Sequence, residues 1–212
     1  MFSENLADFA RASKYLPDLA PDVAFLIKPD FFYGNINKPE PNDLRDKVVK
    51  LAVPRQTRKG HLVLSAAAVG HEAELARYYT SVVKAATLHR KQLKDKTHYF
   101  WMRPVLLSRG EVILTFPWYD TFPESAGLLK SLVDPLPEGL IFEDMEQGWR
   151  FGAYATAEKV YFLQGTETGN HTAVHTDRAR LQQAAAGALA RTRQILEILV
   201  KQVGQDYWRF GQ

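Results

Sequence analysis

The amino-acid sequence predicts an α+β protein in which an antiparallel sheet is packed by a long C-terminal helix. Three observations carry this prediction. The spacing of apolar residues changes from about 3.6 to about 2 after residue 100. Sequence patterns typical of a β-hairpin and of a three-stranded meander follow. The last part of the chain has the clearest pattern of an amphipathic helix. The N-terminal half is expected to be mainly helical. The 212 residues are expected to form a single domain, with 1–98 and 99–212 as the one subdivision considered.

In the first half of the sequence, apolar residues recur mostly at helical spacing. A first short helix is expected over 3–15 and a short strand over 23–27. The segment 28–42 is rich in proline and is expected to be an irregular loop. A second short helix is predicted over 43–51, and the strongest helix of this half over 70–94, where apolar residues recur on one face.

The second half reads as strands followed by one long helix. Strands over 105–107 and 112–116 flank Gly110, which suits a hairpin turn. A short helix is expected over 124–133. The meander is predicted from three ranges: 140–145, 149–156 and 160–164. The last helix is predicted over 177–203, with one continuous apolar face that is expected to lie across the meander.

Composition limits the chemistry that the chain can perform. There is no cysteine, which excludes disulfides, thiolate metal sites and cysteine nucleophiles. The net charge is +3, but residues 1–100 hold 16 basic and 11 acidic residues, and the remainder holds 11 and 13. The N-terminus carries acids where a signal peptide needs bases, and the most apolar stretch, 62–69, is shorter than the roughly 20 residues that span a bilayer. A cytoplasmic protein without membrane insertion is therefore expected.

Common catalytic motifs are missing from the sequence. It contains neither of the glycine-rich motifs that cradle nucleotide phosphates, and no G-x-S-x-G serine elbow. We therefore assign no catalytic residue and no cofactor, and an enzyme is the less favoured interpretation.

The histidines are the remaining candidates for catalysis or metal binding. His171 and His175 are four residues apart, with Asp177 close by, and on a helix they would share a face. The surrounding residues favour a loop instead, so a metal site is not assigned. His89 lies on the apolar face of the predicted 70–94 helix, where it is either a packed histidine or a catalytic base.

Acidic and basic residues gather in two separate stretches. Glu143, Asp144 and Glu146 lie at the end of a predicted strand, where alternation places the first two on opposite faces. This argues against a catalytic pair and leaves a solvated strand end or an acidic binding edge. The basic stretch suggests a nucleic-acid alternative; its members are Arg45, Lys47, Lys50, Arg55, Arg58 and Lys59.

Short motifs in the last third of the chain resemble a known group of proteins. They are Glu146-Gln147-Gly148-Trp149, the helix opening Val174-His175-Thr176-Asp177-Arg178 with Leu181, Arg191-Thr192, and Asp206-Tyr207-Trp208. This pattern is similar to uncharacterised bacterial immunity-type proteins, which neutralise polymorphic or contact-delivered toxins.

The resemblance implies a non-enzymatic protein that binds a toxin and covers its active site. The contact residues expected on this basis are Glu143, Asp144, Glu146, Trp149, Trp118, Tyr119 and Asp120. Because the chain is basic overall, the acidic edge over 134–146 is expected to make the contact if the toxin is cationic. The alternatives are an enzyme that acts on an anionic small molecule or nucleic acid through a histidine, and a nucleic-acid-binding accessory protein that uses 45–59.

Overall fold

The computed structural model describes residues 12–34, 44–53, 61–134, 138–146, 148–166 and 171–209. The chain forms two compact units and passes between them several times. Unit 1 consists of Met1–Asp22, Pro104–Phe116 and Ala126–Leu189, and unit 2 consists of Val23–Arg103, Pro117–Ser125 and Ala190–Gln212. Whether the chain functions as a single domain stays a prediction.

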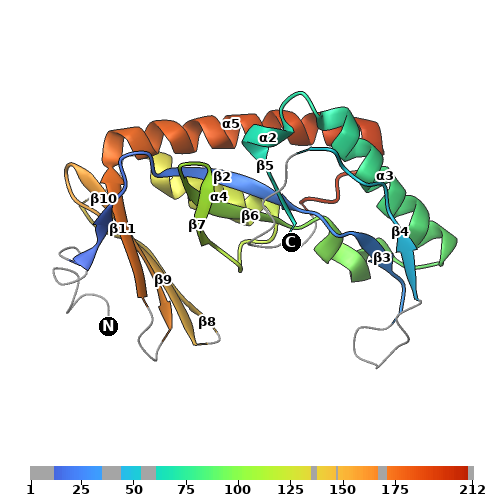
Figure 1. Ribbon diagram of the computed structural model, residues 1–212, viewed down its shortest axis with the longest axis horizontal. Coiled ribbons are helices and arrows are strands. Elements are labelled where there is room, and N and C mark those ends of the chain that lie inside the picture. Colours follow the sequence, from blue (N-terminus) through green and yellow to red (C-terminus); the bar gives the residue numbers. More distant parts are fainter. Residues whose placement is uncertain are drawn as a thin grey trace. The chain divides into compact units, whose positions relative to one another are not determined.

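Unit 1 is built on a five-stranded sheet (Figure 1). Its strands, in spatial order, are β1 (Lys14–Tyr15), β11 (His171–Asp177), β10 (Lys159–Thr166), β9 (Trp149–Ala155) and β8 (Gly139–Glu146). Strand β1 runs parallel to β11, and the other neighbours are antiparallel. The predicted meander over β8, β9 and β10 is confirmed.

The inner face of this sheet contributes to the core of unit 1. Phe151, Phe162 and Val174 are each at most 3% exposed, as alternation along each strand requires. Helices α4 (Phe122–Val133) and α5 (Arg178–Val203) lie close to the predicted ranges, so two further predicted elements are confirmed. On α5 the small residues Ala185 and Ala188 are fully buried, and small side chains allow close packing. Of the helices that the structure describes, none combines the length and the apolar character needed to cross a lipid bilayer.

A tight hairpin joins β6 (Met102–Ser108) to β7 (Glu111–Thr115), as the sequence predicts. Arg109 and Gly110 at its turn have φ values of 53° and 77°, the left-handed region that a two-residue hairpin turn requires. Asp18 fixes the turn, because its carboxylate accepts hydrogen bonds from the Ser108 hydroxyl (2.8 Å) and the Arg109 backbone N–H (2.5 Å). These two bonds lower the pKa of Asp18.

Replacing Gly110 by alanine should lower the free energy of unfolding by about 1 kcal/mol, because a Cβ is disfavoured at positive φ. Gly187→Ala is the matched control. It lies within α5 with open space around the position of a Cβ, so we expect stabilisation by about 0.5–1 kcal/mol. Urea unfolding of both variants measures the difference. Equal effects of the same sign would contradict the turn geometry.

Unit 2 contains short strands and the helix α3. Its elements are β3 (Asp30–Phe32), β4 (Arg45–Lys47), β5 (Leu62–Leu64), α2 (Ser65–Ala68), α3 (Glu72–Leu88) and the 3-10 helix η2 (Leu93–Tyr99). Strand β2 (Ala20–Leu26) pairs with β5 over residues 24–26, and β3 pairs with β4. The four-stranded sheet to which β2 belongs has the order β5-β2-β6-β7.

An aromatic cluster forms the centre of unit 2. The ring of Trp208 lies edge-on to Tyr79 at 4.9 Å and to Phe100 at 5.7 Å between centroids. Tyr78 lies edge-on to Tyr79 at 5.0 Å. Trp208, Tyr78 and Tyr79 are at most 1% exposed. Edge-to-face packing of this kind stabilises beyond the area that it buries.

The prediction of a mainly helical N-terminal half is wrong, because most of its elements are strands. The helix predicted over 43–51 is absent, since Arg45–Lys47 form β4. Strand β4 pairs with β3, and β3 lies within the segment 28–42 that was predicted to be an irregular loop. Of the helix predicted over 3–15, residues 3–11 lie outside the described residues, and Lys14–Tyr15 form β1. The helix predicted over 70–94 is confirmed as α3, but it ends earlier, at Leu88. Two residues later Arg90 has a φ of 51°, which is outside the right-handed helical region.

Candidate functional site

A row of large side chains crosses the outer face of the five-stranded sheet in unit 1. Strand register places Tyr15 opposite His175, His175 opposite Tyr161, and Tyr161 opposite Tyr154. Leu140 on β8 lies opposite Tyr154 and completes the row. The His175 ring centroid lies 5.2 Å from that of Tyr15 and 5.0 Å from that of Tyr161. The row therefore joins all five strands on the face that the inner core leaves free.

The β1 end of this row carries a compact set of charged contacts. The Tyr15 hydroxyl donates to Asp177 (2.8 Å), and the Lys159 ammonium forms an ion pair with the same carboxylate. The ammonium also lies 4.5 Å from the centre of the Tyr15 ring. The hydrogen bonds from Lys159 and Tyr15 lower the pKa of Asp177. These groups satisfy one another, so they hold the short β1 strand against β11.

Ser13 and His175 are placed like the nucleophile and the base of a catalytic triad. The Ser13 hydroxyl lies 2.8 Å from Nδ1 of His175. Burial, together with the charge of Lys159, lowers the pKa of His175, so its ring is neutral near pH 7. Within the described residues, no carboxylate is hydrogen-bonded to the other ring nitrogen, the contact that orients the base in a catalytic triad. The described contacts of Ser13 and His175 therefore do not make up a complete catalytic triad.

The structure corrects the placement of the two neighbouring histidines. His171 and His175 lie on strand β11, not in a loop. Residues four apart on a strand are separated by about 13 Å along it, which is too far for one metal ion. Within the described chain, no group of three or more histidine and acidic residues is arranged to hold a metal.

The β8–β9 end of the sheet exposes apolar side chains. Leu140 is 50% exposed, Met145 62% and Trp149 45%. Tyr15 adds a fourth, so four of the eight exposed large hydrophobic residues in the described chain belong to this sheet. Strand β8 is the last strand of the sheet, and no other described strand pairs with its outer side. Apolar side chains beside an open strand edge are typical of a surface that binds a protein.

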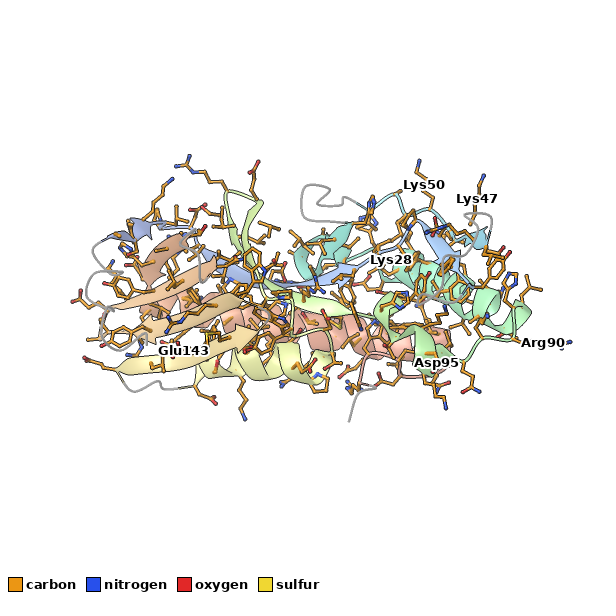
Figure 2. All side chains as sticks on the ribbon, turned by 90° about the horizontal axis from the view of Figure 1, so that it is seen from below. Lys28, Lys47, Lys50, Arg90, Asp95 and Glu143 are labelled. Carbon is orange, nitrogen blue, oxygen red and sulfur yellow. The ribbon has the colours of Figure 1, made fainter. Side chains whose placement is uncertain are left out.

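The acidic residues of β8 are distributed as the sequence predicts. Glu143 lies opposite Gly152, and Asp144 opposite Phe151, which places the two on different faces. Glu143, which Figure 2 labels, accepts two hydrogen bonds from the Arg150 guanidinium, at 2.9 and 2.6 Å. The backbone of Glu146 pairs with Trp149 at the end of the hairpin. Leu140 and Met145 share the face of Glu143. Neither was predicted as a contact residue, although the alternation of apolar and acidic residues along this strand could have indicated an exposed apolar side chain.

An open hollow of about 700 Å³ lies within unit 1 beside β1. Its charged lining residues are Lys14, Asp18, Arg109 and Glu111, and Tyr15 lines it as well. Two bases and two acids give it no net charge, and Asp18 is already engaged by the hairpin turn. The hollow extends the uneven surface near Tyr15 but presents no pair of groups suited to acid–base catalysis.

The other predicted contact residues, Trp118, Tyr119 and Asp120, belong to unit 2 and are half-buried. Asp120 forms an ion pair with Arg103 at 2.6 Å, and its backbone carbonyl accepts from the N–H of Met102 at 2.9 Å. Burial raises the pKa of Asp120 in spite of the arginine. The contacts of Asp120 fix this segment of unit 2, and its role in binding a partner stays a prediction.

His89 caps the end of α3 and is held by two contacts in unit 2. Its ring stacks on Tyr33 with 3.7 Å between centroids, and its Nε2 lies 2.6 Å from a carboxylate oxygen of Asp46. Asp46 is on β4, so this contact ties β4 to α3. His89 lines neither the hollow beside β1 nor the pocket at Lys28 described below. A packing role accounts for these contacts.

Of the six cations in the basic stretch, the structure describes three, and one of these forms an ion pair. Arg45 forms an ion pair with Asp30 at 2.8 Å. Lys47 and Lys50 are exposed, and no carboxylate of the described residues pairs with them. Arg55, Arg58 and Lys59 lie outside the described residues.

Comparison with known proteins gives no relative: no family model, no curated protein and no solved structure matches this chain. The function must therefore be argued from the surface itself. The part of that surface with the strongest physical signal is the β8–β9 end of the five-stranded sheet.

The acid sensitivity of the fold should depend on His98. Burial, followed by the charges of Lys28 and Lys96, lowers the pKa of His98 to about 4. An unfolded histidine takes up a proton near pH 6.5, so unfolding is favoured progressively as the pH falls from about 6.5 towards 4. Allowing for partial exposure, we expect a loss on the order of 1–2 kcal/mol over this range. His98→Gln should flatten the profile; identical slopes in denaturant unfolding would contradict it.

Proposed function

We propose that the protein is a non-enzymatic binding module of the immunity type, which neutralises a bacterial toxin by covering its active site. The observation that carries the proposal is the exposed β8–β9 end of the five-stranded sheet. Leu140 and Met145 are exposed on the face of Glu143, and Trp149 is exposed on the opposite face, that of Asp144 and Phe151. A few well-packed side chains near the centre of an interface supply most of its binding energy, and tryptophan is prominent among them. The similarity of the C-terminal motifs to immunity-type proteins supports the same proposal.

The charge of β8 favours a partner other than a second copy of this chain. Glu143, Asp144 and Glu146 follow one another along this edge, and Glu138 precedes it. Pairing of β8 with another β8 would bring like charges together, which opposes self-association. A basic partner would instead gain from the contact and would associate faster at low salt. The expected partner is therefore a protein with a basic surface around an apolar depression.

On this proposal we expect a toxin to be encoded by a gene adjacent to that of this protein, and titration with the product of that gene is the test. Saturable binding below about 1 μM, seen by calorimetry, and restored growth when both genes are co-expressed are the expected results. No heat of binding at micromolar protein would overturn the proposal. Binding without protection from the toxin would leave a protein-binding module but remove the immunity role.

A further inference from the structure

A second candidate site lies in unit 2 and shares no residue with the β8–β9 end of the five-stranded sheet. It is a pocket of about 350 Å³ lined by Ile27, Lys28, Pro29, Lys47, Val48, Val49, Lys50, Leu51 and His61. All of these residues belong to unit 2. The volume is at the lower end of the range typical of small-molecule sites.

Backbone contacts hold the three walls of the pocket in place. The pairing of Asp30 with Lys47 places the start of β3 beside the end of β4. The Ile27 N–H donates to the His61 carbonyl at 2.8 Å, which brings His61 to the same pocket. The Val49 N–H donates to the Ser81 hydroxyl at 3.1 Å and ties the third wall to α3. The pocket is therefore a feature of the fold, not an accidental gathering of surface side chains.

The lining contains three lysines and a histidine but no acid. The acids nearest in the sequence are engaged elsewhere, since Asp30 pairs with Arg45 and Asp46 with His89. No described carboxylate pairs with the ammonium groups of Lys28, Lys47 or Lys50. Figure 2 shows Lys47 and Lys50 extending to the same side of the unit. The charge of Lys28 also lowers the pKa of His98, behind burial, which is consistent with a positive potential here.

Of these three lysines, Lys28 interacts electrostatically with Asp120: burial raises the pKa of that carboxyl, and the charge of Lys28 partly offsets the rise. Like charges at one pocket repel one another, and an anion that enters it relieves the repulsion. Lysine ammonium groups bind phosphate oxygens through charge-assisted hydrogen bonds. The floor adds apolar contacts, because Ile27 and Leu51 are each only 3% exposed and Pro29 and Val48 lie beside them. The combination suits a phosphate group attached to a small organic body.

We propose that this pocket binds a small phosphorylated molecule, with Lys28, Lys47 and Lys50 around the phosphate. Its small volume favours a compact ligand over a nucleic-acid backbone, which needs an extended basic surface. The inference is independent of the proposed toxin binding, which uses unit 1.

The test measures binding of ribose 5-phosphate and inorganic pyrophosphate by calorimetry at low salt, with a single-stranded oligonucleotide as a separate arm. We expect saturable binding of a small probe, weakened at least about tenfold by Lys47→Gln with Lys50→Gln, because the double variant loses two charge-assisted hydrogen bonds to the phosphate. The control variant, Lys84→Gln with Lys201→Gln, removes the same charge from exposed helical positions of unit 2 and should bind within about twofold of the unmodified chain.

Three outcomes would overturn the inference, with circular dichroism confirming that each variant is folded. The first is no saturable binding of either small probe at about 10 mM. The second is an equal loss in both double variants, which would mean that net charge alone attracts the anion. The third is binding of the oligonucleotide without binding of the small probes, which would favour a nucleic-acid surface instead.

Discussion

Trp208→Ala should lower the free energy of unfolding by about 3–5 kcal/mol, the loss typical of truncating a large buried aromatic residue. Its ring is 1% exposed and lies edge-on to Tyr79 and Phe100. Its backbone carbonyl also accepts a hydrogen bond from the Phe122 N–H at 2.9 Å. The truncation therefore opens a cavity beside the rings of Tyr79 and Phe100, which lose their packing contacts with the indole.

Trp149→Ala is the matched control, because it removes the same side chain from a position that is 45% exposed. We expect a change in stability of about 0.5 kcal/mol or less. Chemical unfolding of both variants at one pH provides the comparison. Similar losses in the two would contradict the assignment of Trp208 to the core of unit 2 and of Trp149 to a binding surface.

Met145→Arg should weaken binding to the proposed toxin partner by about 30-fold or more, which corresponds to about 2 kcal/mol. Met145 is 62% exposed and lies on the face of Glu143, so the change should leave the fold intact. In the complex, however, a guanidinium would be desolvated among apolar groups and would face a basic partner.

Two further substitutions separate the causes of this loss. Met145→Glu should weaken binding less than Met145→Arg, since an acid is attracted to a basic partner. Leu88→Arg alters another exposed apolar residue, 73% exposed at the end of α3, and should leave binding unchanged. Equal losses from the two Met145 variants would contradict a basic partner, and a loss from Leu88→Arg would contradict the location of the surface.

The sequence predicts the elements of this fold whose signals are local. The helix α5 and the β6–β7 hairpin fall where their periodicity and turn glycine indicate, because these depend on residues close together in the chain. Strand β4 was predicted as a helix because its stability comes from pairing with β3. Strand β11 was overlooked because its inward residues, Thr172, Val174 and Thr176, are small, although their β-branched alternation was a usable signal.

The candidate site was predictable only in part, for a related reason. Glu143 and Trp149 were predicted from one hairpin, and the register of β8 with β9 confirms that Glu143 and Asp144 lie on opposite faces. The row from Tyr15 to Leu140 was not predicted, because Tyr15 and His175 are 160 residues apart and meet only through sheet topology. The pocket at Lys28 likewise combines three separate segments, of which sequence inspection identified only the lysines of one.

The central claim, that the β8 edge of the five-stranded sheet binds a protein, is tested most directly by hydrogen–deuterium exchange. The amides of Gly139–Glu146 are followed with and without the product of the adjacent toxin-like gene. The account predicts slower exchange on addition of the partner, concentrated in this strand and at Trp149. Binding that leaves the exchange of β8 unchanged would contradict it.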